Sequence, residues 1–228
     1  MADSRPVSGE KHPSRWTALA ALLAAILLLS ACKSAAVPST GFGSSAPLAQ
    51  PSWPTPADPI TLATQAGLVS EQQEYLITHI HAHLDLFVDG HPVLVPAGIG
   101  IEIGAAGVRD EKTPDGTAHQ YFVDICQAPC LSPLHTHDPS GMIHEESRTP
   151  NHPPYSLGQF FTEWGLKLDS SCVGEYCRPD ALIHIYLDGT PFNGDPASIQ
   201  LKSHLEIAIV IGQPPSLVPS TYAFGDQP

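Results

Sequence analysis

Two clusters of histidines have a spacing that suits metal coordination, and the first follows an alternating pattern. Apolar residues separate its members, which are His79, His81, His83 and the aspartate Asp85. Alternate residues of a β-strand project from one face about 6.8 Å apart, so adjacent imidazoles can converge on one ion at about 2.0–2.1 Å. Because three histidines in such a row rarely all bind one ion, we expect two of them to be ligands and the third to serve a second ion or to support the first.

The second cluster surrounds a predicted turn and contains His135, His137 and His144. Residues 138–141, Asp-Pro-Ser-Gly, have the composition of a type I turn, so two strands are expected to fold back there. With a plain two-residue loop, His135 faces His144 and the three histidines share one face. A bulge at the glycine would instead place His144 opposite Thr136, on the other face. The first register is favoured because it puts the isoleucine before His144 in the core, but the sequence leaves both open.

Further ligand types lie beside the histidines. Met142 offers a thioether, and Asp85 and Glu146 offer carboxylates that could bind an ion or orient the imidazole rings. Imidazole coordination suits zinc and copper, and a thioether on the same face would favour copper because soft sulfur suits Cu(I). The candidate ligands of a copper or zinc ion are therefore the histidines of the two clusters, His79, His81, His83, His135, His137 and His144.

Three classes of function fit this pattern. The first is a protein that binds a transition metal for buffering, delivery or resistance. The second is a metalloenzyme in which metal-bound water is the nucleophile and Glu146, Glu145 or Asp138 acts as general base. The third is a structural protein whose histidines are incidental. Apart from His12 in the N-terminal segment, the histidines outside the clusters are scattered, and only the last two lie next to predicted strands of a second repeat: His91, His119, His152, His184 and His204.

The charge of the chain argues against one class of partner. The 228 residues include 23 Asp and Glu against 10 Lys and Arg, which gives a formal net charge of −13. Nucleic-acid binding depends on Lys and Arg that neutralise phosphates, so no nucleic-acid partner is expected. The same acidity would attract cations to the histidines.

The N-terminal segment has the pattern of a bacterial lipoprotein signal. Basic residues precede an apolar run over residues 17–29, which is shorter than the roughly 20 residues of a membrane span. The sequence Leu29-Ser30-Ala31-Cys32 resembles the lipobox, and the resemblance implies that Cys32 is acylated, becomes the mature N-terminus and anchors the chain to a lipid bilayer outside the cytoplasm. Lys33, in place of the aspartate that retains such proteins in the inner membrane, permits outer-membrane sorting in a Gram-negative cell.

Composition divides the chain into four parts. Residues 1–31 are the predicted lipoprotein signal peptide, and residues 32–61, rich in Ser, Ala and Pro, are predicted to be a flexible lipidated tether. Residues 62–212 form the expected histidine-rich β domain, and residues 213–228 a Pro-rich tail. After Cys32, the remaining cysteines are Cys126, Cys130, Cys172 and Cys177. In an oxidising compartment they indicate two disulfides, for which pairing within each local pair is simplest; a zinc site made of all four is the alternative.

The expected fold is mainly β within the α+β class, an antiparallel sandwich or barrel-like sheet with one short helix. Residues 78–88 alternate as a strand, and Asp89-Gly90 supplies a tight hairpin turn. Residues 183–191 repeat this plan at an offset of 99, and residues 207–211 resemble residues 99–103, so a duplicated three-strand hairpin unit is possible. The helix is expected to start at Ser156, whose Ser-x-x-Gln pattern is a capping box, and Trp164 is expected in the core.

The motifs His-x-His-x-His and His-Thr-His-Asp, with the Ile-His and Glu-Ser that follow, resemble those of a group of uncharacterised secreted bacterial proteins. The resemblance covers roughly residues 75–212. It implies an extracytoplasmic domain with those limits and implies no activity.

Overall fold

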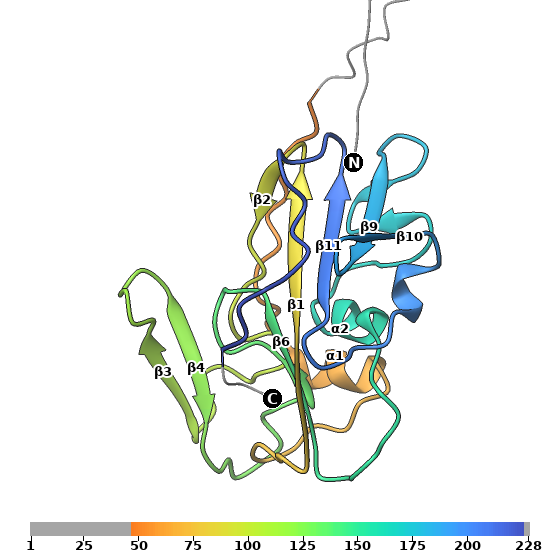
Figure 1. Ribbon diagram of the computed structural model, residues 1–228. Coiled ribbons are helices and arrows are strands. Elements are labelled where there is room, and N and C mark those ends of the chain that lie inside the picture. Colours follow the sequence, from red (N-terminus) through yellow and green to blue (C-terminus); the bar gives the residue numbers. More distant parts are fainter. Residues whose placement is uncertain (1–46, 226–228) are drawn as a thin grey trace, which may run out of the picture. The chain divides into compact units, whose positions relative to one another are not determined.

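Seven strands form one sheet at the centre of the fold (Figure 1). The computed structural model describes residues 47–225, so the predicted signal peptide and Cys32 lie outside the described residues. The strand order is β10-β9-β11-β1-β6-β5, and β2 also pairs with β1. The strands are β1 (Thr78–Val88), β2 (His91–Val93), β5 (Leu134–His135), β6 (Met142–Ser147), β9 (Ile183–Leu187), β10 (Thr190–Phe192) and β11 (Glu206–Ile211).

The predicted mainly β class is confirmed, but the sheet is mixed instead of antiparallel. Strands β1 and β11 run parallel, with His83 beside Glu206 and Val88 beside Ile211. The other pairings of the large sheet are antiparallel. A parallel neighbour requires a long crossover connection, and most of the domain lies between these two strands in the sequence.

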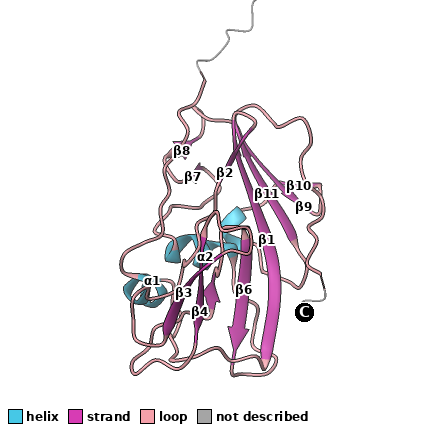
Figure 2. Cartoon of the chain, turned by 90° about the vertical axis from the view of Figure 1, so that its left-hand side faces the viewer, coloured by secondary structure: helices cyan, strands magenta, loops and turns pink. Residues whose placement is uncertain are grey.

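The two faces of β1 have different environments. Leu84, Leu86 and Val88 belong to the main hydrophobic core, which also contains Phe160 and Phe161. These aromatic residues lie on helix α2 (Leu157–Glu163), which packs beside helix α1 (Pro59–Gln65) on one side of the sheet (Figure 2). The opposite face of β1 carries the alternating histidines, so the apolar face fixes the direction in which the imidazoles point.

Both predicted hairpins are present. In the first turn, φ is 47° at Asp89 and 78° at Gly90. In the second, φ is 50° at Asp188 and 74° at Gly189. These angles fit a type I′ turn, which matches the twist of the strands that it joins. Leu86 pairs with Val93 in the first hairpin, as Ile185 pairs with Phe192 in the second. The repeat predicted at an offset of 99 therefore holds for the hairpins.

The third strand of the predicted repeat is present in only one copy. Residues 207–211 lie within β11, but in residues 99–103 Ile101 makes only an isolated bridge to Leu131. Positive φ angles at Gly98, Gly100 and Gly104, between 74° and 91°, bend the backbone there and prevent an extended strand.

The predicted helix and disulfides are confirmed. Ser156 caps α2 through the predicted capping box with Gln159, and Trp164 is buried in the core. The disulfides join the two local pairs, Cys126–Cys130 and Cys172–Cys177. The remaining elements are the β3–β4 hairpin (Val108–Lys112 and His119–Val123), the β7–β8 hairpin (Cys172–Val173 and Tyr176–Cys177) and a short 3₁₀ helix (Pro196–Ser198).

Residues on either side of the expected 62–212 domain also contact it. Trp53 is buried, with its ring centroid 5.9 Å from that of Trp164. Near the other end, Tyr222 stacks on His83 with centroids 3.7 Å apart. Among residues 47–225, no helix is long and apolar enough to cross a membrane. The two disulfides indicate an oxidising compartment outside the cytoplasm.

Candidate metal centre

Three adjacent strands bring one histidine of the first cluster and two of the second into one row. His144 on β6 lies directly opposite His81 on β1 and directly opposite His135 on β5. Residues paired across a sheet share a face, so these three imidazoles lie side by side. The pairing of His135 with His144 confirms the register of the plain two-residue loop. His79 pairs with Glu146 in the next row, which adds a carboxylate to the same face.

The ligand atoms of this cluster are separated by distances typical of a metal site. His81 Nε2 lies 3.0 Å from His144 Nδ1, and His135 Nε2 lies 3.2 Å from His137 Nε2. Glu146 Oε1 lies 3.4 Å from His79 Nε2, 3.7 Å from His144 Nδ1 and 3.9 Å from His135 Nε2. Four ligands arranged tetrahedrally at about 2.0–2.1 Å from zinc are about 3.3 Å from one another. The observed distances are close to this value.

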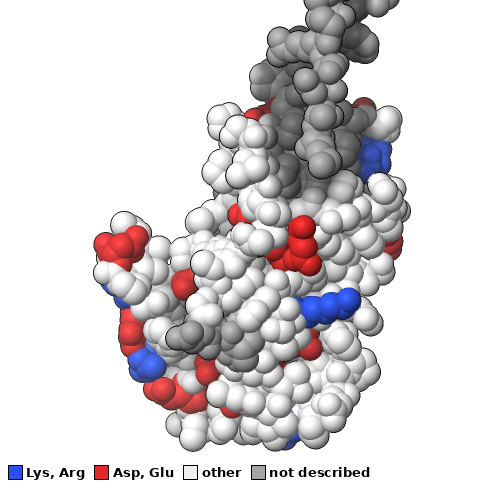
Figure 3. Space-filling view, in the orientation of Figure 1, with Lys and Arg blue, Asp and Glu red and all other residues white. Residues whose placement is uncertain are grey.

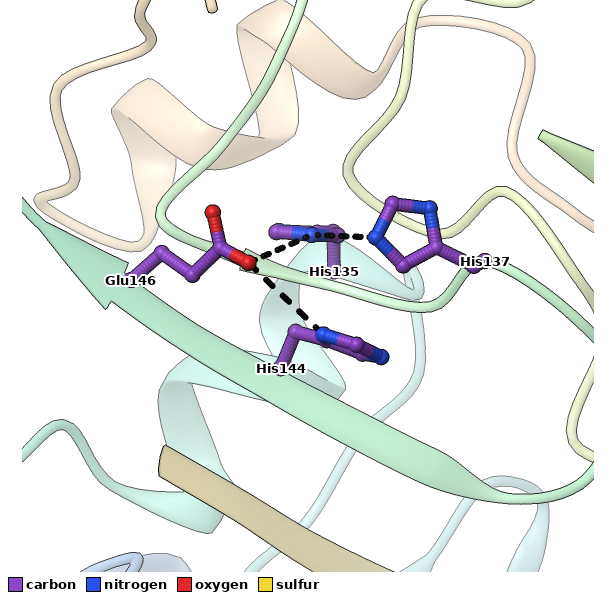
Figure 4. A group of neighbouring side chains, drawn as sticks. All are labelled: His135, His137, His144 and Glu146. Atoms are coloured by element: carbon purple, nitrogen blue, oxygen red, sulfur yellow. Dashed lines mark hydrogen bonds and ion pairs between the residues drawn. The ribbon is translucent and has the colours of Figure 1, made fainter. Parts of the chain in front are cut away.

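Hydrogen bonds to the backbone fix two of the imidazole tautomers. His135 Nδ1–H donates to the carbonyl of Ser132 at 3.0 Å, and His137 Nδ1–H donates to the carbonyl of Tyr121. A carbonyl only accepts, so in a neutral ring the proton is on Nδ1 and the lone pair is on Nε2. The Nε2 atoms of His135 and His137 therefore direct lone pairs toward each other across 3.2 Å (Figure 4). A cation between them would remove this repulsion.

Burial disfavours the charged form of several of these imidazoles, His135 and His144 above all. It lowers the pKa of His135 and of His144 well below the ordinary value, and the neighbouring histidines lower the pKa further. The pKa of His79 is also lowered, chiefly by burial. Burial raises the pKa of the Glu146 carboxyl to about 8, and the Glu74 carboxylate adds to the shift. Neutral imidazoles have the lone pairs that a metal ion requires.

The described residues contain three groups that could hold a metal ion. The first is His135, His137, His144 and Glu146, drawn in Figure 4, and the second is His79, His81 and His144. Because they share His144, we treat them together as the histidine centre, made of His79, His81, His135, His137, His144 and Glu146. The third group is His83, Asp85 and Glu206, which has no member in common with the other two.

The structure thus brings five of the six predicted histidine ligands together, and His83 lies in a separate group with Asp85. Met142 lies on the histidine face of β6 and pairs with His83. Two candidate bases lie elsewhere. Asp138 caps its own turn by accepting from the Ser140 N–H at 2.8 Å, and Glu145 lies on the opposite face of β6, 3.4 Å from His152.

The scattered histidines lie outside the three groups. His204 stacks on Phe224, and His119 lies 2.6 Å from Asp110 on the β3–β4 hairpin. His91 and His184 are exposed. Sequence reasoning missed Glu206, although an acidic residue at the start of an apolar strand was a usable signal. It also missed Glu74, 3.6 Å from His137, for which the sequence pattern gives no signal.

A cavity of about 380 Å³ reaches the histidine centre at Glu146. Its lining combines aromatic, hydroxyl and charged side chains, including Tyr75, Ser132, Arg148 and Tyr155. Glu146 Oε2 is buried and has no hydrogen-bonding partner within the described residues. The carboxyl of Glu146 therefore connects the histidine centre with a space large enough for a small molecule.

A scan of the chain against protein-family models finds no match, and searches of the curated proteins and of the solved structures find none either. The resemblance to secreted bacterial proteins is an expectation from motifs, and the function is inferred from the geometry of the site.

Proposed function

We propose that this chain is an extracytoplasmic lipoprotein that binds a transition-metal ion, zinc or copper, in the histidine centre and serves metal storage, delivery or resistance. The observation that carries the proposal is the pair of Nε2 lone pairs of His135 and His137, 3.2 Å apart and directed at each other. An additional proton between them would charge a fully buried imidazole whose pKa is already depressed. A metal ion that also binds His144 and Glu146 satisfies both nitrogens.

The donor set supports zinc or copper over harder cations. Imidazole nitrogens bind both metals well, and three imidazoles with one carboxylate can complete a four-coordinate site. Met142 supports copper, because its thioether belongs to the same face and suits Cu(I). Acidic side chains are more widespread than basic ones on the face seen in Figure 3, which would raise the local concentration of cations.

Metal analysis of the purified full-length chain tests this proposal. We expect about one equivalent of zinc or copper to remain after dialysis, and we expect the triple variant His135→Gln, His137→Gln, His144→Gln to lose it. His184→Gln is the matched control, because this exposed histidine lies on β9, outside the three groups. A folded wild-type chain that takes up no stoichiometric zinc or copper would refute the proposal.

The cavity at Glu146 supports a second candidate, a metalloenzyme in which Glu146 acts as general base toward a substrate in that cavity. A carrier has to exchange its ion readily, whereas a hydrolytic enzyme holds its ion and turns over substrate. Loss of the ion to a chelator within minutes, with no hydrolysis of small activated esters, would favour the carrier. Retention of the ion together with ester hydrolysis that Glu146→Gln abolishes would favour the enzyme.

A further inference from the structure

His83, Asp85 and Glu206 form a second polar group, distinct from the histidine centre. The parallel pairing of β1 with β11 places His83 beside Glu206, and Asp85 lies two residues further along the same face of β1. His83 Nδ1 is 2.9 Å from Glu206 Oε2 and 3.8 Å from Asp85 Oδ2. One ligand atom from each residue lies within 4.8 Å of the others.

The orientation of the His83 ring directs a lone pair at the two carboxylates. Its Nε2–H donates to the carbonyl of Ser140 at 2.8 Å, so in the neutral ring Nδ1 has no proton. This nitrogen, an acceptor, then faces two carboxylate oxygens, which are also acceptors. A cation among the three groups, or a proton on Nδ1 shared with Glu206, satisfies such a set of acceptors.

Burial makes an unneutralised carboxylate at this position costly. The side chain of Glu206 is 1% exposed, and its Oε1 has no hydrogen-bonding partner within the described residues. Within residues 47–225, Glu206 and Asp85 form ion pairs with His83 and with no lysine or arginine. The ring of Tyr222 covers the imidazole by stacking on it at an interplanar angle of 12°.

We propose that His83, Asp85 and Glu206 form a second metal site, which takes a divalent cation of the manganese type. The site has one nitrogen and two carboxylates, and carboxylate-rich sets favour harder ions than imidazole-rich sets do. An octahedral cation with ligands at about 2.1 Å has neighbouring ligand atoms about 3 Å apart, close to the distance between His83 and Glu206. Asp85, whose side chain is 32% exposed, gives the ion a route from solvent. The second oxygen of Glu206 is available for bidentate coordination.

Manganese titration followed by electron paramagnetic resonance tests the second site. Free Mn²⁺ in solution gives a six-line spectrum that weakens on binding. The full-length chain first receives one equivalent of zinc and is then titrated with Mn²⁺. We expect one Mn²⁺ to bind per chain, and we expect Asp85→Asn and Glu206→Gln each to weaken the binding at least tenfold. His184→Gln, which changes an exposed histidine on the neighbouring strand β9, should leave binding unchanged.

Several outcomes distinguish this proposal from the proposed function. The absence of Mn²⁺ uptake, or uptake that both carboxylate variants leave intact, would overturn the second site. Circular dichroism checks that the variants fold. If Glu206→Gln does not fold, Asp85→Asn still tests the site, because Asp85 is partly exposed and its replacement leaves the core intact. If the histidine centre binds no zinc, the same titration without zinc still tests the second site, since the two sites share no ligand.

Discussion

Glu163 on α2 provides a test of the core that supports the histidine centre. Its side chain is fully buried. Burial raises the pKa of the Glu163 carboxyl well above its ordinary value, and the nearby Ser132 side chain offsets only part of the shift. At a pH between the ordinary pKa of 4.5 and the raised pKa, the folded protein keeps this carboxyl neutral, whereas the unfolded chain ionises it.

The sign of the pH dependence follows from proton counting. At a pH between the pKa of Glu163 in the unfolded chain and its higher pKa in the folded protein, the folded state binds one more proton at this residue than the unfolded state does. The free energy of unfolding then falls as pH rises through this window, by up to about 1.4 kcal/mol for each pH unit. Glu163→Gln removes the titrating group and keeps the shape, so this part of the decline should disappear.

Urea denaturation of the wild type and Glu163→Gln at several pH values from 5 upward measures the effect. We expect the stability of the variant relative to wild type to increase with pH. Glu111→Gln, which removes one negative charge from the exposed strand β3, controls for the change in net charge. A constant difference between wild type and Glu163→Gln over this pH range would refute the assignment of a neutral, buried Glu163.

Three further predictions concern metal binding, the turn and the helix cap. At a zinc concentration of about 100 times Kd, zinc should raise the melting temperature by about 5–10 °C in a thermal shift assay, and the His135, His137, His144 triple variant should not respond. Gly141→Ala should lower the free energy of unfolding in urea by about 1–3 kcal/mol, because φ is +91° and a Cβ would lie 2.5 Å from the Leu84 carbonyl oxygen. Ser156→Ala should cost about 0.5–2 kcal/mol in the same assay, because the serine caps α2; a cost below 0.3 kcal/mol would contradict that role.

Local patterns predicted the first strand and the hairpins, and they favoured one of two registers for the second cluster. The alternation around His81 fixed the face of β1, because its apolar residues had to enter the core. The pairing of His135 with His144 agrees with the register that buries Ile143, which the sequence favoured without excluding the other. These features depend on residues close in sequence, for which turn chemistry and side-chain periodicity are sufficient.

Long-range pairing could not be predicted in the same way. Glu206 lies 123 residues after His83, and no local pattern indicates that β11 runs parallel to β1. The strand expected at residues 99–103 is absent although its isoleucines alternate as a strand requires. The reason is that Gly98, Gly100 and Gly104 adopt positive φ angles. Hydrophobic alternation indicates which side chains are buried, but the backbone angles of the intervening glycines decide whether the segment can be extended.

The division of the first histidine row between two sites follows from the neighbours of β1. Residues 78–83 of β1 pair with β6, while residues 83–88 pair with β11. His79 and His81 therefore lie opposite Glu146 and His144, and the site on that side is rich in nitrogen. His83 is where the two pairings overlap, and its Nδ1 faces the carboxylate from β11. A single alternating row can thus serve two ions of different chemistry, because the strand beside each histidine supplies the other ligands.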